Sequence, residues 1–376
     1  MAHSFRDTAD MTLRRTQPAH SAVLKFTLAG VLTAAWAAVL GATSAAQAAP
    51  PGPECANVSA QTCALAARLG RGVNLGDIYD PPQEGDWGQK MQPEFIDLAT
   101  KYFKTVRLPV RWSNHASLDA TATLDEGFAR RVDASIEALL ARGVVVIVNV
   151  HHYNQLHGSA LHRGESEVAP EVVETRYLNI WRQLAERYKN KPDRLIFELL
   201  NEPHDKLDGE PWNVLLRKAL AVVRSSNPNR TVMIGPSSWG HPKDLPRLRL
   251  PADKHLIVSF HTYDPFAFTH QGAEWLPAKF PAGQPCCDAT QHAQAVAPIE
   301  AAYQWSVKAG VPVHLGEFGT LNRAPMEARA AWARIMRDAA ERRGIGWTYW
   351  GLVGGFGLWD APRRQWHEPL RAALLD

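Results

Sequence analysis

Residues 195–203 read LIFELLNEP, an apolar run with the length of a buried β-strand that nevertheless carries two glutamates, Glu198 and Glu202. Strands of a parallel sheet are covered on both faces and are therefore almost continuously apolar. A carboxylate without a partner inside such a strand costs several kcal/mol to remove from water. The stretch therefore indicates a parallel sheet with polar chemistry at one point of it.

Seven further stretches of this kind lie on either side. They read RGVNLG (71–76), TVRLPV (105–110), VVVIVNVHH (144–152), TVMIGP (231–236), LIVSFHTY (256–263), VPVHLGEFG (311–319) and IGWTYWGL (345–352). Between the strands, apolar residues recur at helical spacing over 124–142, 172–189, 212–225, 291–309 and 326–343. Eight strands alternating with helices over about 300 residues predict a single-domain α/β protein, a (β/α)8 TIM barrel. A doubly wound sheet is disfavoured, because no glycine-rich phosphate loop follows the first strand.

The first 48 residues have the features of a secretory signal peptide. Basic residues precede an uncharged apolar stretch (26–42), and Ala46-Gln47-Ala48 supplies small residues at the spacing of a cleavage site. An uncleaved membrane anchor is the alternative, because the apolar stretch approaches the length of a spanning helix. The Arg14-Arg15 pair leaves open whether export uses the twin-arginine route. We expect a secreted or periplasmic protein with a signal peptide (1–48), an N-terminal segment (49–69) and a barrel domain (70–376).

Composition excludes several classes of partner. The chain is 45% hydrophobic and 21% charged, which is typical of a globular protein with an ample core. The first 48 residues hold four basic and two acidic side chains, so without them the net charge of +3 falls to +1. We therefore expect no nucleic-acid partner, no membrane partner after signal cleavage, and a monomer. Thirteen tryptophans hint at flat ligands such as sugar rings, on which an indole can stack.

The four cysteines suggest disulfides without fixing their pairing. In an exported protein Cys55 and Cys63 are spaced to close a small loop. The adjacent pair Cys286 and Cys287 is expected to seek other partners or to stay reduced, because bonding between neighbours strains the peptide. None of the four forms the C-x-x-C pair of a zinc site.

Polar side chains gather at the carboxyl ends of the strands, the face that carries the active site in such barrels. They are Arg107, His151, His152, Asn201, Glu202, His261, Tyr263, Glu317 and Trp350. Two carboxyl groups facing one point are what glycosidic cleavage requires, one to give a proton and one to attack or to activate water. Arg107 and Tyr263 are suited to keep one of them ionised, and that charge raises the pKa of its neighbour.

Several motifs together resemble glycoside hydrolase family 5, the cellulase family. They are VRLPVRW (106–112), VNVHHYN (148–154), FELLNEPH (197–204), VSFHTYDPFAFTHQGAEW (258–275), LGEFG (315–319) and WTYWGL (347–352), in that order and spacing. RGVNLG followed by EGDWG (84–88) is similar to the branch of bacterial endoglucanases that also accept mannans. The resemblance runs from Gly72 to about Leu352.

The resemblance implies a role for each matching residue. Glu202 looks like the general acid/base and Glu317 like the nucleophile, with Asn201 bonding the sugar 2-hydroxyl. Arg107 and Tyr263 would hold Glu317 ionised. The remaining positions are His151 and His261 around the carboxylates, Trp350 as a stacking floor, and His152, His270, Trp275 and Phe356 along the cleft.

Two positions depart from the family pattern. Asp77 stands where relatives have Asn, and Asp80 where a Glu is common, beside the distal glycone subsites. Loop aspartates equally often cap turns, so their role stays open. No metal or cofactor is expected, because the first strand lacks the His-x-His of a metal-dependent barrel hydrolase.

The resemblance implies a retaining endo-β-1,4-glucanase acting on β-glucan by double displacement. A β-mannanase or another β-glycanase of the same clan would share both glutamates, and a non-catalytic polysaccharide-binding barrel would have lost one of them. Without a carbohydrate-binding module after the barrel, soluble or amorphous glucans are the expected substrates. Glu198 lies on the same strand face as Glu202 but about 13 Å deeper by strand rise. We expect it to be structural, bonded to Thr105, Asn149, Ser259 or Thr348.

Overall fold

The structure, a computed structural model, describes residues 52–376 and shows eight parallel strands closed into a barrel in sequence order. The strands are β1 (Arg71–Asn74), β2 (Thr105–Leu108), β3 (Val145–Asn149), β4 (Leu195–Glu198), β5 (Val232–Ile234), β6 (Leu256–His261), β7 (Val313–Glu317) and β8 (Gly346–Tyr349). β8 pairs with β1 and closes the ring. The predicted fold is confirmed. The expected signal peptide lies outside the described residues.

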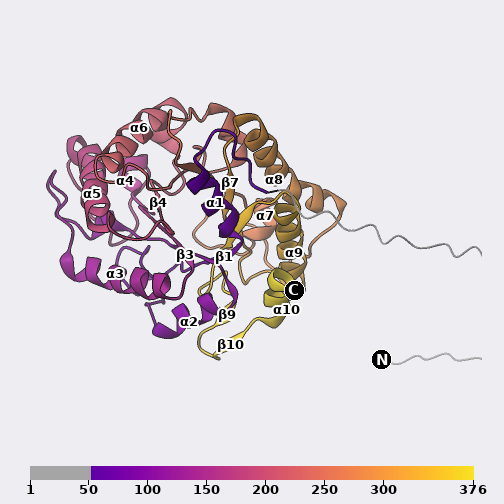
Figure 1. Cartoon of the computed structure of the whole chain (residues 1–376). Helices are drawn as coiled ribbons and strands as arrows, with labels where there is room; N and C mark the ends of the chain where they lie inside the picture. The colour runs from indigo at the N-terminus through magenta and orange to yellow at the C-terminus, as the bar shows by residue number, and fades with distance from the viewer. Residues whose placement is uncertain (1–51) are drawn as a thin grey trace, which may run out of the picture. The chain divides into compact units, whose positions relative to one another are not determined.

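Helices form an outer ring around the strands (Figure 1). They are α2 (Pro93–Tyr102), α3 (Glu126–Ala141), α5 (Val173–Tyr188), α6 (Glu210–Arg224), α8 (Ala289–Ala309), α9 (Met326–Arg342) and α10 (Glu368–Leu375). Between β5 and β6 only a short 3-10 helix, η4 (Pro242–Arg247), is present, because prolines at its start and at Pro246 interrupt helical hydrogen bonding. The connections also contain the short helices η1 (Trp112–Asn114), α4 (Asn154–His157), η2 (Pro170–Val172), η3 (Asp205–Leu207) and α7 (Phe266–Thr269), and the hairpin β9 (Trp359–Asp360) and β10 (Gln365–Trp366).

Local sequence explains where the main helices begin and which face they bury. Asp125 precedes α3 and accepts a hydrogen bond from the backbone N–H of Phe128, and Asp288 forms a capping box with Gln291 at the start of α8. Along α5 the buried residues Tyr177, Ile180, Trp181, Leu184 and Tyr188 recur at intervals of one helical turn. This spacing turns one continuous apolar face toward the barrel.

A helix before the first strand plugs the amino-terminal end of the barrel. Helix α1 (Ala60–Leu69) begins at Ser59, whose side chain accepts from the backbone N–H of Thr62. In Figure 1 it lies across the centre of the ring. Its Leu65, Ala66 and Leu69 form a separate core cluster with inward side chains of the strands, namely Val145, Ile147, Ile196, Met233 and Ile257. The opposite, carboxyl-terminal mouth is thus the end left for a site.

All four cysteines are paired. Cys55 and Cys63 form a disulfide that ties the start of the N-terminal segment to α1. Cys286 and Cys287 are bonded to each other, so the prediction that this pair would avoid its neighbour was wrong. The peptide between them is cis, and their Cα atoms lie 3.1 Å apart, close enough for the two sulfurs to meet.

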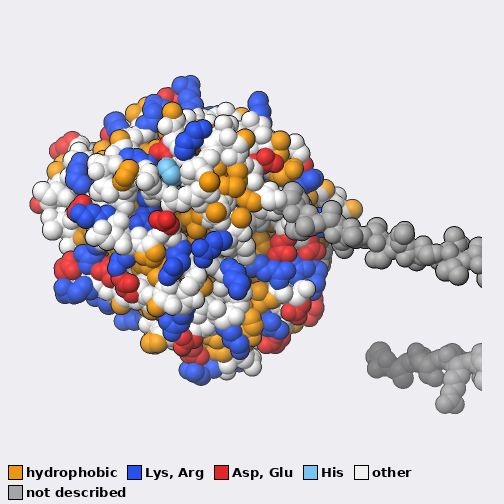
Figure 2. Space-filling view, viewed as in Figure 1, with side chains coloured by type: hydrophobic (Ala, Val, Ile, Leu, Met, Phe, Trp, Pro, Cys, Tyr) orange, Lys and Arg blue, Asp and Glu red, His pale blue; other side chains and the backbone are white. Residues whose placement is uncertain are grey.

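The face that carries α1 shows basic and acidic side chains interspersed with small apolar areas (Figure 2). No field of a single sign covers this face, as a site for nucleic acid would require. Among residues 52–376 the structure contains no helix with both the length and the apolar character needed to cross a bilayer.

Candidate active site

The two glutamates predicted to act together meet at the carboxyl-terminal mouth of the barrel. Glu317 is the last residue of β7, and Glu202 follows the end of β4, where the backbone N–H of Asn201 bonds to the carbonyl of Val150. A carboxylate oxygen of Glu202, one of Glu317 and a ring nitrogen of His261 all lie within 4.8 Å of one another. Both carboxyl groups can therefore face the same bond of a bound molecule.

Arg107 joins most of the polar residues at the mouth through one buried guanidinium group. Its Nη1 donates to Glu317 Oε1 at 2.6 Å and to Asn74 Oδ1 at 2.9 Å. Its Nη2 donates to Asn201 Oδ1 at 2.7 Å, and its Nε donates to Glu198 Oε2 at 2.7 Å. A guanidinium group is rigid and planar, so these bonds fix the partners relative to one another.

Glu317 is held at both oxygens. While Arg107 binds Oε1, the hydroxyl of Tyr263 donates to Oε2 at 2.9 Å. Burial raises the pKa of Glu317, and His261, Arg107 and Tyr263 oppose that rise. Burial and the neighbouring Glu317 charge raise the pKa of Tyr263 well above its usual value, so its phenol stays a hydrogen-bond donor. Gly316 permits this packing, because a Cβ there would lie 2.4 Å from Ser259 Oγ and 2.7 Å from His261 Nε2.

Glu202 sits in a different environment. Its Oε1 lies 2.8 Å from His261 Nδ1, but none of the hydrogen bonds of Arg107 reaches it. Burial raises the pKa of Glu202 to about 7, with a further rise from the Glu198 charge that His204 and Arg107 counteract. Its φ of 36° is rare for a side-chain-bearing residue, and such strain is concentrated at functional sites.

Three carboxyl groups, the buried Glu198 and Glu317 and the half-buried Glu202, thus lie near one guanidinium group. Burial raises the pKa of Glu198 as well, but the Arg107 charge and the hydrogen bonds from Arg107 and Asn149 are among the influences that together outweigh it, and the pKa of Glu198 is lowered. Glu198 and Glu317 both contact Arg107 directly, whereas Glu202 does not. Because ionising a third carboxyl group here adds charge that Arg107 does not pair, Glu202 is the one of the three best suited to keep a proton.

The expected surroundings of Glu198 were correct only in part. Asn149 donates to Glu198 Oε2 at 2.8 Å, as predicted. Thr105 and Thr348 instead donate to backbone carbonyls, and Ser259 Oγ has no hydrogen-bond partner among the described residues. The principal partner is Arg107, which serves Glu198 as well as Glu317. Strand β4 ends at Glu198, so the rise per residue of a strand does not determine the distance between Glu198 and Glu202. Glu198 and Glu317 bind different nitrogens of the same guanidinium group.

An aromatic wall stands beside the carboxylates. The ring of His151 stacks on Trp350 with centroids 5.5 Å apart and planes within 5°, and His152 packs edge-on against His151 at 4.4 Å. Trp350 lies directly over Gly76, where a Cβ would be 2.6 Å from the indole. Burial lowers the pKa of both histidines well below the usual value, so both rings are neutral.

The other predicted cleft residues lie around Tyr263. His270 packs edge-on against Tyr263 at 5.0 Å and against Phe356 at 5.6 Å, and burial lowers its pKa to about 4. Trp275 lies at the edge of His270 with 62% of its surface exposed. Phe356 is buried, whereas Trp275 offers a free ring face to a ligand.

Asp77 and Asp80 lie in the loop after β1. Asp80 is completely buried, and its Oδ1 accepts from the backbone N–H of Ile78. Burial and the Asp77 charge raise the pKa of Asp80 to about 8, and burial raises the pKa of Asp77 to about 6. One oxygen of Asp80 lies within 4.8 Å of ring nitrogens of His151 and His152.

This cluster has the residue types of a metal site but the wrong hydrogen-bond direction. The amide nitrogen of Asn149 lies 3.1 Å from His151 Nδ1 and can only donate to it. His151 Nδ1 is therefore an acceptor, and its Nε2 carries the hydrogen. The protonated Nε2 of His151 has no lone pair for a metal. It is instead an N–H group that can donate a hydrogen bond to a ligand.

Two aromatic residues at the rim were missed from the sequence. Trp239, just after β5, is 51% exposed and stacks on His204 at 4.8 Å, and His204 stacks on His157 at 4.0 Å. Trp87, in the loop after β1, is 38% exposed and packs edge-on against His152 at 5.6 Å. Trp239, and also Asn74, which binds Arg107, could have been found from the sequence, because each lies at or just beyond the carboxyl end of a barrel strand.

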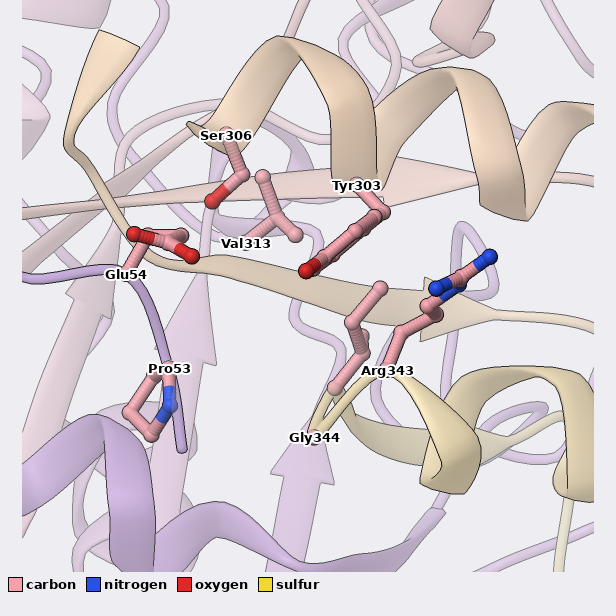
Figure 3. Close-up of a pocket in the computed structure, with 8 residues that line it drawn as sticks. Pro53, Glu54, Tyr303, Ser306, Val313, Arg343 and Gly344 are labelled. Atoms are coloured by element: carbon pink, nitrogen blue, oxygen red, sulfur yellow. The ribbon is translucent and has the colours of Figure 1, made fainter. Parts of the chain in front are cut away.

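Two hollows in the structure lie away from the glutamates. One, of about 10 Å³, is lined by Pro53, Glu54, Tyr303, Ser306, Val313, Arg343, Gly344 and Ile345, near the amino-terminal end of the barrel (Figure 3). It has room for about one water molecule. The other, of about 700 Å³, lies between the loop after β3 and the start of α6, lined by Ser159, Lys206, Leu207, Pro211 and Val214 among others. Neither contains a catalytic candidate.

Comparison with known proteins gives a consistent picture. A sequence model described as Cellulase (glycosyl hydrolase family 5) matches residues 70–354. Endoglucanase H of Acetivibrio thermocellus is 33% identical over 298 residues, which cover 79% of this chain. The aligned part is 31% of that relative, so the chain spans about a third of its length.

Solved structures match over nearly their whole length. Cel5A of Thermotoga maritima in complex with mannotriose is 37% identical, with a TM-score of 0.77 over 83% of this chain and 99% of that chain. Cel5A from the same organism in complex with cellobiose has the same identity, TM-score and coverage.

Proposed function

Because the chain belongs to the cellulase family, glycosyl hydrolase family 5, across residues 70–354, we propose that it is a retaining endo-β-1,4-glucanase. The observation that carries the proposal is the pair of carboxyl groups of the half-buried Glu202 and the buried Glu317, with oxygens within 4.8 Å. Retaining glycosidases place their carboxyl groups about 5–5.5 Å apart, whereas inverting enzymes need roughly 6.5–9.5 Å to admit a water molecule. The short separation therefore favours direct attack by one carboxylate.

In the first step Glu317 is the nucleophile. A carboxylate oxygen of Glu317 attacks the anomeric carbon while the bond from that carbon to the leaving oxygen breaks. Glu202, which burial allows to keep its proton up to about neutral pH by raising its pKa to about 7, gives its proton to the leaving oxygen. The products are a shortened chain with a free hydroxyl and a glycosyl ester on Glu317.

In the second step the roles of Glu202 reverse. Its carboxylate takes a proton from a water molecule, whose oxygen attacks the anomeric carbon and displaces Glu317. Two inversions restore the original configuration, and both glutamates return to their starting protonation states. His261, which contacts Glu202 and is kept neutral by burial, is placed to orient this carboxyl group in both steps.

The neighbours of the pair have matching tasks. Arg107 and Tyr263 aim the attacking oxygen of Glu317 by fixing the whole carboxylate. Asn201, whose carbonyl oxygen is held by Arg107, can bond the sugar 2-hydroxyl through its amide group, which also lies beside Glu202. Trp350, half-buried and backed by His151, forms the floor under the sugar ring.

Exposed tryptophans on two sides of the mouth support cleavage within a chain. Trp87 follows β1 and Trp239 follows β5, which lie four strands apart in a ring of eight. Each is braced from behind, Trp87 by Arg111 with the guanidinium 5.7 Å from the ring, and Trp239 by His204. A polysaccharide crossing the mouth can stack on both while Glu202 and Glu317 face its middle.

A β-mannanase is the second candidate. It is favoured by the likeness to Cel5A of Thermotoga maritima, which was crystallised with mannotriose as well as with cellobiose. Of the two aspartates that depart from the family pattern, Asp80 has an oxygen within 4.8 Å of ring nitrogens of His151 and His152, and Asp77 lies close enough to Asp80 to raise its pKa. They act on substrate preference through these rings, because Asp80 is itself fully buried.

The decisive experiment compares substrates and stereochemistry. Initial rates on carboxymethylcellulose, glucomannan, mannan, xyloglucan and laminarin separate a glucanase from a mannanase. Proton NMR of the first product formed must show the β-anomer if configuration is retained. Appearance of the α-anomer first would refute double displacement. Activity confined to mannan would make the second candidate correct.

Residues 1–48 are proposed to direct export and to be cleaved. The features that support this are the charge-free apolar stretch and the Ala46-Gln47-Ala48 motif. We expect the protein expressed in full to be recovered from the periplasm or medium with a new amino terminus at Ala49, and to act as a monomer. Amino-terminal sequencing of the recovered protein and its elution volume on size exclusion test both points.

A further inference from the structure

We propose that Glu198 is a positioning residue that holds Arg107 toward Glu317 and Asn201 and sets the ring tautomer of His151. This inference rests on the function proposed above. Glu198 does not reach the cleft, since its side chain is buried beneath the catalytic pair. It acts through two hydrogen bonds to one oxygen, from Arg107 Nε at 2.7 Å and from Asn149 Nδ2 at 2.8 Å.

The first arm runs through Arg107. Because Glu198 binds Nε, the two terminal nitrogens of the guanidinium point away from it, toward Glu317 and Asn201. The planar group cannot rotate toward one partner without leaving another. Glu198 therefore orients the nucleophile and the amide that binds the 2-hydroxyl with a single contact.

The second arm runs through Asn149. Its Oδ1 accepts from the backbone N–H of Val110 at 3.2 Å and its Nδ2 donates to Glu198, and these two contacts together fix the amide so that the other hydrogen of Nδ2 points to His151. His151 Nδ1 must then accept, and its Nε2 must carry the hydrogen. The chain of bonds makes His151 a donor toward a sugar hydroxyl.

Glu198 also shares the positive charge of Arg107 with Glu317, because both carboxylates pair with the same guanidinium group. The groups around Glu198 are Arg107 from β2, His151 after β3, Glu202 after β4, His261 from β6, and His314 and Glu317 from β7. The negative charge of Glu198 weakens the pull of Arg107 on Glu317 and raises the pKa of Glu202. A residue that only filled space would influence neither titration.

The test is Glu198→Gln, which preserves shape and an acceptor oxygen but removes the charge. Inactivation by a 2-deoxy-2-fluoro-β-cellobiosyl fluoride needs no proton from Glu202, so its pH dependence reports the ionisation of Glu317 alone. We expect the inactivation midpoint to move to lower pH by about one unit, because Arg107 then serves Glu317 undivided. The alkaline limb of polysaccharide hydrolysis should move down as well, because Glu202 loses a neighbouring negative charge.

A matched control is Glu341→Gln. Glu341 is bound to Arg71 at 2.7 Å, outside the site, so the change removes an ion-paired carboxylate without touching Arg107. Both pH midpoints should stay at wild-type values. If Glu198→Gln also leaves both midpoints unchanged, the inference is overturned, whatever happens to the rate.

If Glu198→Gln fails to fold, a second variant still tests the positioning role. Glu198→Asp keeps the charge but shortens the reach, so the pH midpoints should stay while the maximal inactivation rate falls on the order of tenfold through misplacement of Arg107. A wild-type rate would overturn the positioning role. If the wild-type protein is not labelled on Glu317 at all, the proposed function itself fails, and that outcome is distinct from the others.

Discussion

His261 Nδ1 lies 2.8 Å from Glu202 Oε1 and 3.8 Å from Glu317 Oε2, so a single ring stands between the two carboxyl groups. Burial lowers the pKa of His261, and the ring is neutral. A neutral imidazole leaves the proton of the site on a carboxyl group. Because Arg107 contacts Glu317 but not Glu202, the arrangement favours Glu202 as the group that holds this proton.

The first prediction concerns pH. Activity requires Glu317 ionised and Glu202 protonated, so it should fall in acid as Glu317 takes up a proton. It should fall again as pH rises through about 7, where Glu202 loses its proton. Measuring kcat/KM on a soluble glucan between about pH 4 and 9 gives both limbs.

An aryl cellobioside with a good leaving group provides the control. Its departure needs no proton, so formation of the glycosyl ester should lose the alkaline limb and keep the acid limb. Persistence of the same alkaline limb would show that a group other than Glu202 causes it.

The second prediction is that Tyr263→Phe impairs chemistry more than folding. The change removes one hydrogen bond to a charged oxygen of Glu317, which is worth about 1.5–3 kcal/mol. We expect kcat/KM to fall on the order of 10- to 100-fold. The acid limb should move to higher pH, because the remaining carboxylate is less stabilised and its pKa rises.

Tyr303→Phe is a suitable comparison for that experiment. Tyr303 lies on α8 beside the small hollow (Figure 3). This hollow is near the amino-terminal end of the barrel, whereas the glutamates are at the carboxyl-terminal mouth. It should retain full activity with an unmoved acid limb. An unmoved limb in Tyr263→Phe too would argue that the hydroxyl does not tune Glu317.

The third prediction concerns the two rim tryptophans. Trp239→Ala and Trp87→Ala each remove one stacking surface, worth about 1–3 kcal/mol per ring by analogy with other aromatic stacking. KM for long glucans should rise about 5- to 150-fold in each, with kcat little changed. Viscometry against reducing-end release should show less cleavage within chains.

Trp275→Ala separates the rim from the centre. Trp275 is more exposed than either rim residue but lies beside His270, which in turn packs against Tyr263. If the cleft runs from Trp87 to Trp239, its loss should alter short and long substrates alike. Identical behaviour of all three variants on every chain length would contradict a cleft with the tryptophans at its ends.

The barrel and its pair of glutamates could be predicted from the repetition of strands and from the residue types at strand ends. Eight apolar strands alternating with helices specify a barrel, and a barrel brings Glu202 and Glu317 together although 114 residues lie between them in the chain. The residue types predicted Arg107 and Tyr263 as partners of one carboxylate, the family resemblance pointed to Glu317, and both side chains donate to Glu317 in the structure.

The features that could not be predicted depend on which partner each side-chain atom contacts in the folded protein. Arg107 has several donors, and strand order does not say that Nε turns inward to Glu198 while Nη1 turns to Glu317. The Cys286–Cys287 bond depends on a local backbone conformation that no spacing rule encodes. The brace of His204 behind Trp239 joins two loops, and loops are the part a single sequence specifies least.

The last prediction tests the plug formed by α1. Leu69 is almost fully buried among inward side chains of the strands, so Leu69→Ala leaves a cavity where no neighbour can easily move in. Large-to-small changes of this kind cost about 2–5 kcal/mol of the free energy of unfolding. Leu118→Ala removes the same atoms from a side chain that is 57% exposed and should change stability by less than about 0.5 kcal/mol. Urea denaturation of both variants measures the difference, and kcat/KM at 25 °C should stay at the wild-type value in each because α1 lies at the end opposite the glutamates. Equal stability of the two variants would mean that α1 covers the barrel without being part of its core.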